Sequence, residues 1–586
     1  MRALALVSAT ALTLSGLPPA PIDPLLAQSS AHELNASDPD QVCAPFLTGD
    51  LDEYVARGRI GSLRSDPIAM SGAVPTAPPP PPPPPPPSPP PMVSMESAAP
   101  MGRMAPSRIR VPQADRERYQ GEEVAAVQAV VEAPVSTFGV DVDTGSYANV
   151  RRILNQGTLP PQAAVRTEEM LNYFRYDYPA PRDRSRPFSL TSDMTTTPWN
   201  ENSRLLRIGL RGYDVPREGR PPANLVFLVD VSGSMNSPDK LPLVQCSLAL
   251  LADRLDRRDR VAIVVYAGAA GLVLPSTSSR DQIVQSLKRL SAGGSTAGAA
   301  GIQLAYRVAR ENMIDGGINR VVLATDGDFN VGVTNNETLV EMVEREREAG
   351  VTLTTLGYGT GNYNEAMMER IADHGNGNYS YIDSPREAQK VLEQELQSTL
   401  FTIAQDVKIQ VEFNPAYVSQ YRLIGYENRA LREQDFNNDA VDAGDIGAGH
   451  QVTALYEIIP AGSRGWLPER RYEANRPTGQ GANNGELAHL RLRYKLPGDD
   501  RSRLIEQPVQ AGLLSAARAP VGDVAFIAAV AAYGQLLRGD SNLNGFSFAD
   551  VRRLAAQARI DTYWRREFVE LASLAERQQL AGGGGK

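Results

Sequence analysis

The stretch Asn224–Asn236, which reads NLVFLVDVSGSMN, decides the fold. It begins with an unbroken apolar run, Leu225–Val229. A strand that is buried on both faces has this pattern, which is typical of a parallel sheet covered by helices. Asp230, Ser232 and Ser234 follow at alternate positions around a glycine. Small oxygen-bearing side chains on a loop at the carboxyl end of a buried strand suit a hard divalent cation.

The sequence after this loop alternates between helical and strand patterns. Apolar strands are expected at 260–266, 320–325, 351–357 and 379–382. Amphipathic helices are expected at 240–255, 281–290, 297–312, 337–349, 364–374 and 385–399. This alternation predicts a doubly wound, Rossmann-like α/β domain over residues 221–402. The loops at the carboxyl ends of its strands should converge at one edge of the sheet.

Two further loops are expected at that edge, and each carries an oxygen-bearing side chain. Thr296 ends the sequence GGST just before an expected helix, and Asp326 directly follows the strand pattern of residues 320–325. With the first loop they supply hydroxyl and carboxylate oxygens, the ligands that a cation such as Mg²⁺ prefers. The candidate metal ligands are therefore Asp230, Ser232, Ser234, Thr296 and Asp326.

These residues resemble the von Willebrand factor type A (VWA) family with its metal-ion-dependent adhesion site. The family pattern Asp-x-Ser-x-Ser, a later Thr and a later Asp is matched at all the candidate positions. The resemblance implies Mg²⁺, with Mn²⁺ or Ca²⁺ as alternatives, at the top of the sheet. In the family one or both Asp residues reach the ion through water, so its charge is incompletely compensated and one position stays open. Because Mg²⁺ prefers six oxygen ligands, the implied partner is a protein that presents an Asp or Glu carboxylate.

A wider resemblance, over about residues 135–580, is to exported bacterial proteins of the YfbK type. It rests on FGVDVDTGSYANVRRILNQGTLPP (138–161), GGSTAGAAGI (293–302), LATDGDFNVG (323–332) and FNNDAVDAGDIGAGHQVTALYEI (436–458). It implies that the α/β domain has its own N-terminal segment and its own C-terminal domain. The resemblance defines architecture more firmly than activity.

The N-terminal part of the chain is expected to lack a core. Residues 1–27 are interpreted as a signal peptide, with Arg2 before an apolar run, the alternative being a disordered apolar leader. Residues 28–133 are interpreted as a disordered linker, because Pro78–Pro87 and Pro89–Pro91 form an extended polyproline spacer. A ligand for a proline-binding domain is the alternative. The expected location is outside the cytoplasm, in the periplasm, at the cell surface or secreted.

The regions on either side of the α/β domain are expected to contain β structure. Residues 134–220 should form helices, one of them capped by Ser146, and strands at 187–191 and 204–213. Residues 403–500 alternate apolar and polar side chains, which predicts a β-rich, sandwich-like domain. If strands from the two regions share a sheet, the α/β domain is an insertion in a split β domain. Residues 501–580 are expected to form a C-terminal helical segment.

Cysteine spacing indicates neither a disulfide framework nor a zinc site. The chain has two cysteines, Cys43 in a polar stretch and Cys246 in an apolar helical pattern, and no CxxC. A buried lone cysteine usually acts as a small hydrophobe. A Cys43–Cys246 disulfide is therefore not expected.

Other metal and adhesion motifs are explained more simply by local structure. Asp141 and Asp143 precede an expected helix, where capping is favoured over a metal site. The segment Asp540–Gly545 matches only the first half of an EF-type calcium loop, since Val551 replaces the final Glu. It overlaps the tripeptide Arg538-Gly539-Asp540, which arises often by chance. A turn between helices is the favoured interpretation.

Charge and motif content narrow the function classes. The net charge of −9 and the absence of a nucleic-acid motif argue against a nucleic-acid partner. No apolar run is long enough for a transmembrane span. No catalytic nucleophile–base pair is evident either, so an enzymatic activity is not expected. The main hypothesis is an exported, Mg²⁺-dependent protein-binding module for adhesion or scaffolding. The alternatives are a cell-envelope assembly or stress protein with a structural metal and, more remotely, a metal-assisted hydrolase. The oligomeric state stays open.

Overall fold

The computed structural model describes residues 43, 46–47, 117–119, 121–140, 142–182, 186–216, 219–294, 298–327, 336–361, 363–394, 398, 400–441, 443–468, 485–499 and 501–583. The predicted signal peptide and both polyproline runs lie outside these residues. Within the described residues, no helix is long and apolar enough to cross a membrane.

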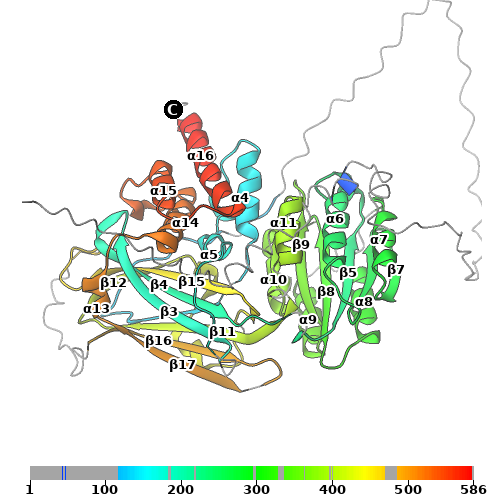
Figure 1. Ribbon diagram of the computed structural model, residues 1–586, viewed down its shortest axis with the longest axis horizontal. Helices are drawn as coiled ribbons and strands as arrows, with labels where there is room; N and C mark the ends of the chain where they lie inside the picture. Colours follow the sequence, from blue (N-terminus) through cyan, green and yellow to red (C-terminus); the bar gives the residue numbers. More distant parts are fainter. Residues whose placement is uncertain are drawn as a thin grey trace, which may run out of the picture.

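Six strands form the sheet of the α/β domain. They are β5 (Ala223–Asp230), β6 (Arg260–Tyr266), β7 (Ala270–Thr277), β8 (Ile318–Thr325), β9 (Thr352–Tyr358) and β10 (Tyr379–Ile382). Their order is β10-β9-β8-β5-β6-β7, so β5 lies inside the sheet with a parallel neighbour on each side (Figure 1). Every residue of β5 is buried, as its apolar run predicts.

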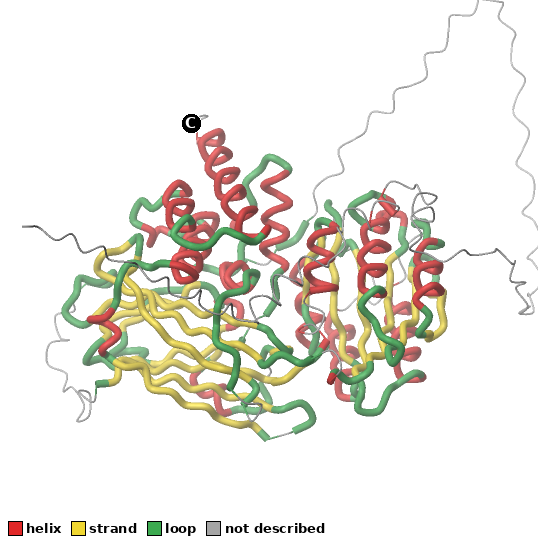
Figure 2. Tube along the Cα trace, in the orientation of Figure 1, coloured by secondary structure: helices red, strands yellow, loops and turns green. Residues whose placement is uncertain are grey.

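Helices cover both faces of this sheet (Figure 2). They are α6 (Leu241–Ala252), α7 (Arg280–Lys288), α8 (Gly298–Glu311), α9 (Asn336–Glu348), α10 (Glu365–His374) and α11 (Pro385–Gln389). Leu225, Phe227 and Val229 of β5 share a core with α6 and α7. Val226 and Leu228 share the opposite core with α8, α9 and α10. The two-residue period of the strand thus divides one apolar run between two cores.

The edge strand β7 is absent from the sequence-based prediction. It pairs antiparallel with β6, whereas the other strands of this sheet are parallel to their neighbours. Its residues are mostly half-exposed, with Leu272 exposed, and it contains Pro275. A proline cannot donate to a ladder and is tolerated at an edge. This composition hides an edge strand from a search for buried apolar runs.

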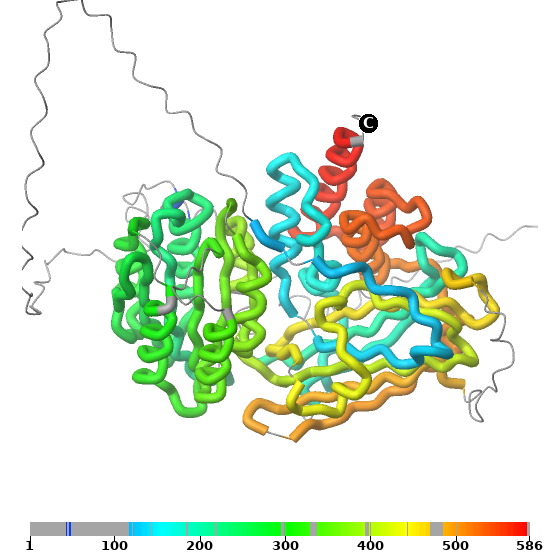
Figure 3. The backbone as a smooth tube through the Cα atoms, turned by 180° about the vertical axis from the view of Figure 1, so that it is seen from behind, coloured from blue at the N-terminus to red at the C-terminus, as the bar shows by residue number. Residues whose placement is uncertain are grey.

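Two antiparallel sheets lie beside the α/β domain (Figure 3). The first has the order β1-β12-β15-β4-β3, formed by β1 (Gln128–Ala129), β12 (Val418–Ile424), β15 (Gln451–Pro460), β4 (Asn200–Gly212) and β3 (Phe188–Thr197). The second has the order β13-β2-β11-β16-β17, formed by β13 (Ala430–Leu431), β2 (Val135–Gly139), β11 (Thr402–Phe413), β16 (Glu486–Lys495) and β17 (Ser502–Gln510). β14 (Ile446–Gly447) also pairs with β11.

Strands from before and after the α/β domain pair with one another. β4 pairs with β15 from Arg204↔Ile458 to Arg211↔Gln451, and β2 pairs with β11. The α/β domain is therefore inserted between β4 and β11, which confirms the hypothesis of a split β region. The two sheets contact each other through aromatic side chains, including Phe138 and Phe413 of one sheet against Tyr456 of the other.

The helices outside the α/β domain gather over one sheet (Figure 1). They are α4 (Gly145–Asn155), α5 (Thr167–Asn172), α14 (Gly522–Arg538), α15 (Phe548–Ala555) and α16 (Tyr563–Gly583), and they share one apolar core. The short helix α13 (Gly512–Ala516) follows β17. β17 itself lies beyond residue 500, where the β-rich region was expected to end. β17 is an edge strand with many exposed charged and polar side chains, so it lacks the apolar pattern from which a strand is predicted.

The predicted cap of α4 is wrong. Ser146 lies inside the helix, which begins at Gly145, and its hydroxyl donates to the Ala164 carbonyl and accepts from the Arg166 amide. Thr144 occupies the cap position without a side-chain cap bond. The Ser146 side chain therefore links α4 to the segment at Ala164 and Arg166 instead of capping the start of the helix.

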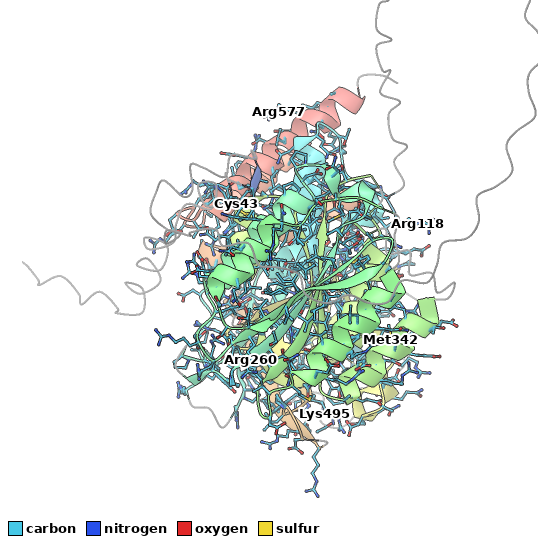
Figure 4. The ribbon with its side chains drawn as sticks, turned by 90° about the vertical axis from the view of Figure 1, so that its right-hand side faces the viewer. Cys43, Arg118, Arg260, Met342, Lys495 and Arg577 are labelled. Atoms are coloured by element: carbon cyan, nitrogen blue, oxygen red, sulfur yellow. A yellow bond between two sulfur atoms is a disulfide. The ribbon has the colours of Figure 1, made fainter. Side chains whose placement is uncertain are left out.

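The folded sequence begins before Pro134, where it was expected to start. Arg118 forms a backbone bridge to Asn364 beside α10, and its place is marked in Figure 4. β1 adds to the edge of the first sheet through pairing with β12. Residues at the end of the expected linker are therefore part of the fold.

Cys43 and Cys246 form a disulfide, so the prediction of unpaired cysteines is wrong (Figure 4). Their Cα atoms lie 5.1 Å apart although 203 residues separate them in the sequence. Both are fully buried, and Phe46 packs in the same apolar core beside α6. A disulfide across such a separation depends on tertiary proximity, which cysteine spacing does not encode.

Buried and half-buried ion pairs link the α/β domain to the rest of the fold. They are Arg151–Asp383, Arg151–Glu387, Arg166–Glu369 and Arg429–Asp373. In each pair the arginine lies outside the α/β domain and the carboxylate lies on α10, on α11 or just before α11. The orientation of the α/β domain is therefore set by its packing against α4, α5 and the loop at Arg429.

Candidate metal centre

The centre begins where β5 ends. Asp230 is the last residue of the strand and has no exposed surface. Its Oδ1 accepts a hydrogen bond from the Ser232 amide at 2.8 Å. This bond turns the chain into the short 3₁₀ helix η3 (Gly233–Asn236), with Ser232 at its start. The oxygen-rich loop is thus ordered by one of its own carboxylates.

Two serine hydroxyls lie together on this turn. Ser232 Oγ and Ser234 Oγ are 3.0 Å apart. Ser232 is buried and Ser234 is half-buried, so the pair lies at the boundary between the core and the surface. At this spacing one cation that approaches from the solvent can bind the lone pairs of both hydroxyl oxygens.

The second predicted loop lies next to the first. The Gly233 amide donates to the Gly294 carbonyl at 3.1 Å, and the Gly293 amide donates to the Val231 carbonyl at 2.8 Å. These reciprocal backbone bonds bring the chain that leads to Thr296 against η3. Thr296 itself lies outside the described residues, so its role stays a prediction.

The third loop supplies Asp326 after β8. Because β8 is the parallel neighbour of β5, with Val229 opposite Ala324, Asp326 lies at the same sheet edge as Asp230. It is fully buried, and its Oδ2 accepts a hydrogen bond from Lys240 Nζ at 2.9 Å. The structure therefore brings together Asp230, Ser232, Ser234 and Asp326 of the predicted set.

Burial governs the electrostatics of Asp230. Its Oδ2 accepts hydrogen bonds from the Tyr266 hydroxyl at 3.2 Å and from Thr325 Oγ1 at 3.1 Å. Burial raises the pKa of Asp230 to about 6; hydrogen bonds from Ser232 oppose that shift, and the negative charge of Asp326 adds to it. A carboxylate that is costly to ionise alone is stabilised by a nearby cation.

The residues present fit a hard divalent cation. The described part of the centre offers carboxylate and hydroxyl oxygens and no sulfur or imidazole, which favours Mg²⁺, Mn²⁺ or Ca²⁺ over softer metals. No cluster of three or more His, Cys, Asp or Glu side chains suited to a metal occurs among the described residues. The hydroxyls are therefore essential to this candidate site.

Three residues of the centre were missed by sequence reasoning, namely Lys240, Tyr266 and Thr325. Thr325 and Tyr266 end the buried strands β8 and β6, and a polar end on an apolar strand was an available signal. Lys240 carried a weaker signal, as a single cation before the apolar helix α6. Only the fold places its side chain against Asp326.

The other motifs considered from the sequence have structural roles. Asp143 accepts a hydrogen bond from the Tyr379 amide and pairs with Arg429, whereas Asp141 lies outside the described residues. Arg538 pairs with Glu427, and Asp540 pairs with Arg422 in the interior. The Arg-Gly-Asp tripeptide is therefore held in buried ion pairs.

Comparisons with known proteins agree with this architecture. Residues 224–394 match the von Willebrand factor type A domain, residues 113–207 match the family described as von Willebrand factor, and residues 398–578 match the C-terminal domain of YfbK. Uncharacterized protein YfbK of Escherichia coli K12 is 48% identical over 469 residues, which cover 78% of this chain and 81% of that protein. The chain belongs to the YfbK family of VWA-domain proteins.

More distant similarities cover a smaller share of the chain. Uncharacterized protein sll0103 of Synechocystis is 30% identical over 189 residues, which cover 32% of this chain and 44% of that protein. A solved structure of a von Willebrand factor type A protein from Catenulispora acidiphila is 15% identical and covers 68% of this chain and 91% of its own, with a TM-score of 0.37.

Proposed function

We propose that this protein is an exported, Mg²⁺-dependent protein-binding module in which a carboxylate of a protein partner completes the shell of the metal ion. The observation that carries the proposal is the meeting of Asp230 and Asp326, both fully buried, with the hydroxyls of Ser232 and Ser234. Membership of the VWA-domain family supports an interaction or adhesion role over catalysis.

The residues of the centre would have different roles toward the ion. Ser232 and Ser234 would bind it directly through neutral oxygens, and the two Asp residues would supply the negative charge, with Thr296 as the expected further hydroxyl. When bound, Mg²⁺ supplies a Lewis-acidic coordination position for a carboxylate oxygen. Tyr266 and Thr325 orient the Asp230 carboxylate through the hydrogen bonds that they donate.

Export is supported by the disulfide as well as by the leader-like N-terminus. Disulfides persist mainly in oxidising compartments and are rare in the cytoplasm. Cys43 and Cys246, the chain's full set of cysteines, pair with each other. A periplasmic or surface location would place the metal centre where a partner protein can reach it.

The test is capture of envelope proteins on the immobilised full-length chain, in Mg²⁺ and in EDTA. Proteins retained in Mg²⁺ should be released by EDTA and should not bind Asp230→Ala. Asp561→Ala is the matched control, because it removes an exposed carboxylate in the C-terminal helical segment, outside the α/β domain. Retention of the same proteins in EDTA and by Asp230→Ala would refute the metal-dependent function.

A further inference from the structure

Lys240 supplies a positively charged ammonium group beside the candidate metal ligand Asp326. It lies just before α6, and its side chain is 7% exposed. Its Nζ lies 2.9 Å from Asp326 Oδ2, and the Asp326 side chain has no exposed surface. A lysine ammonium is rarely buried to this extent without a partner. The pair places a fixed positive charge directly beside one of the candidate metal ligands.

The backbone and the packing around Lys240 hold the ammonium in place. Its amide donates to the Ser237 carbonyl at 3.0 Å, and its carbonyl accepts from the Val244 amide at 2.9 Å. The side chain crosses Gly359, whose φ of +72° and lack of a Cβ leave room for the lysine stem. The Gly359 carbonyl is itself held by the Tyr381 hydroxyl at 2.6 Å. The ammonium is therefore held in position by contacts of the chain itself.

The charges of the described residues give this ammonium a specific consequence. Asp230 and Asp326 together carry two negative charges when ionised, and Lys240 neutralises one of them. A bound divalent ion would then leave the centre with one net positive charge, whereas without Lys240 the net charge would be zero. An incoming carboxylate would restore neutrality only when the lysine is present.

We propose that Lys240 couples metal binding to carboxylate binding: it weakens the affinity for the metal alone and strengthens the capture of a carboxylate by the loaded centre. Lys240 is thus a positioning residue that makes the centre hold its ion firmly only when a partner is bound. This inference rests on the proposed function, because it takes the four oxygen-bearing side chains as metal ligands.

The test is calorimetric titration of Mn²⁺ into the EDTA-treated full-length protein, with and without acetate as the carboxylate probe. Lys240→Met removes the charge and keeps much of the stem, and Lys240→Gln also keeps a hydrogen-bond donor for Asp326. Both variants should bind Mn²⁺ on the order of tenfold more tightly without acetate. Acetate should improve Mn²⁺ affinity in the wild-type protein and much less in either variant.

Controls separate this inference from the proposed function and from folding defects. Lys495→Met removes the ammonium that pairs with Asp406 in the β region and should change neither titration. Thermal unfolding without metal identifies any variant that does not fold, and the other neutral variant then decides. Equal Mn²⁺ affinity in the wild-type protein and the neutral variants, or an unchanged effect of acetate, would overturn the coupling alone. A wild-type protein and neutral variants that all fail to bind Mn²⁺ would overturn the proposed function and the coupling with it.

Discussion

Two buried clusters in this protein set two carboxylates against one cation, and they differ in what surrounds the carboxylates. In the first cluster, at the carboxyl edge of the α/β sheet, Lys240 pairs with Asp326, whose negative charge acts on the nearby Asp230. In the second, Glu457 and Asp540 meet Arg422 between the first antiparallel sheet and the C-terminal helices. The same ratio of charges therefore occurs in both.

The Arg422 cluster is completed by hydrogen-bond donors of the chain. Arg422 donates to Glu457 Oε2 at 2.8 and 3.0 Å and to Asp540 Oδ2 at 2.6 Å. Neutral donors on Trp199, Asn200 and Ser203 also reach Glu457. A guanidinium has five N–H groups in a fixed fork, which suits such a closed arrangement.

The centre at Asp230 is built differently. Asp230 also receives hydrogen bonds, from the Ser232 amide, Tyr266 and Thr325. The centre differs in its pair of serine hydroxyls, Ser232 and Ser234, which offer lone pairs toward a cation, and in its ammonium, which is a point charge rather than a fork. A ratio of two carboxylates to one cation therefore does not by itself identify a metal site. Both clusters contain donors to buried carboxylates, so the feature that indicates a cation-binding site is the pair of additional oxygen acceptors at the surface boundary.

The largest expected effect comes from breaking the closed cluster. Arg422→Met leaves Glu457 and Asp540 buried without their cation, and we expect a loss of about 3–5 kcal/mol in the free energy of unfolding. Denaturant unfolding measures this loss. Arg503→Met, which breaks the exposed Arg503–Asp499 pair, is the control and should cost less than about 1 kcal/mol. A similar small loss for both variants would mean that the Arg422 cluster does not stabilise the fold.

A second prediction concerns the covalent link beside the open cluster. Lys240 immediately precedes α6, which Cys246 links to Cys43, whereas the Arg422 cluster is held by noncovalent contacts. Cys246→Ser should lower the free energy of unfolding by about 2–4 kcal/mol, because the disulfide restricts the unfolded chain. Cys43→Ser and the double variant should lose the same amount. Unequal losses in unfolding experiments would indicate altered packing rather than loss of the bond.

A third carboxyl sharpens the comparison because it is buried without donors. Neither oxygen of Glu365 receives a hydrogen bond from the residues that the structure describes, and Arg166 Nη2 lies 3.9 Å away. Burial raises the pKa of Glu365 to about 8, against the attraction of Arg166. Between about pH 4.5 and 8 the folded protein therefore keeps a proton that the unfolded chain has lost.

This difference in bound protons predicts a pH dependence of stability. The stabilisation is complete below about pH 4.5 and is lost as the pH rises toward 8, by at most about 1.4 kcal/mol per pH unit for one proton. Glu365→Gln should reduce this slope in urea unfolding, most clearly between pH 6 and about 8, because Asp230, whose pKa is raised to about 6, adds to the slope mainly at lower pH. The exposed Glu506→Gln should leave the slope unchanged. An unchanged slope in Glu365→Gln would show that this carboxyl is ionised in the folded protein.

The parts of the fold that sequence predicted well are those specified by local periodicity. The buried run of β5 and the loop after it lie within one short stretch, so the strand, the sheet edge and the candidate ligands Asp230, Ser232 and Ser234 could be predicted together. Asp326 could be placed because it directly follows a second apolar strand. Parallel neighbours then bring the two loops together.

The features that sequence missed depend on contacts between distant segments. The Cys43–Cys246 bond spans 203 residues, and the Lys240–Asp326 pair joins two loops across the sheet edge. Ser146 has the residue type of a helix cap but bonds to Ala164 and Arg166 instead. Residue type was informative in each case, whereas the partner was set by tertiary packing.

Anomalous diffraction from crystals of the full-length protein soaked in Mn²⁺ tests the central claim most directly. We predict a peak at the carboxyl end of β5, about 2–2.5 Å from Ser232 Oγ and Ser234 Oγ, and its loss in Asp230→Ala. No peak should occur at the Arg422 cluster, whose arginine and two carboxylates are buried away from the surface. A centre without Mn²⁺, or a peak that persists in Asp230→Ala, would contradict the account.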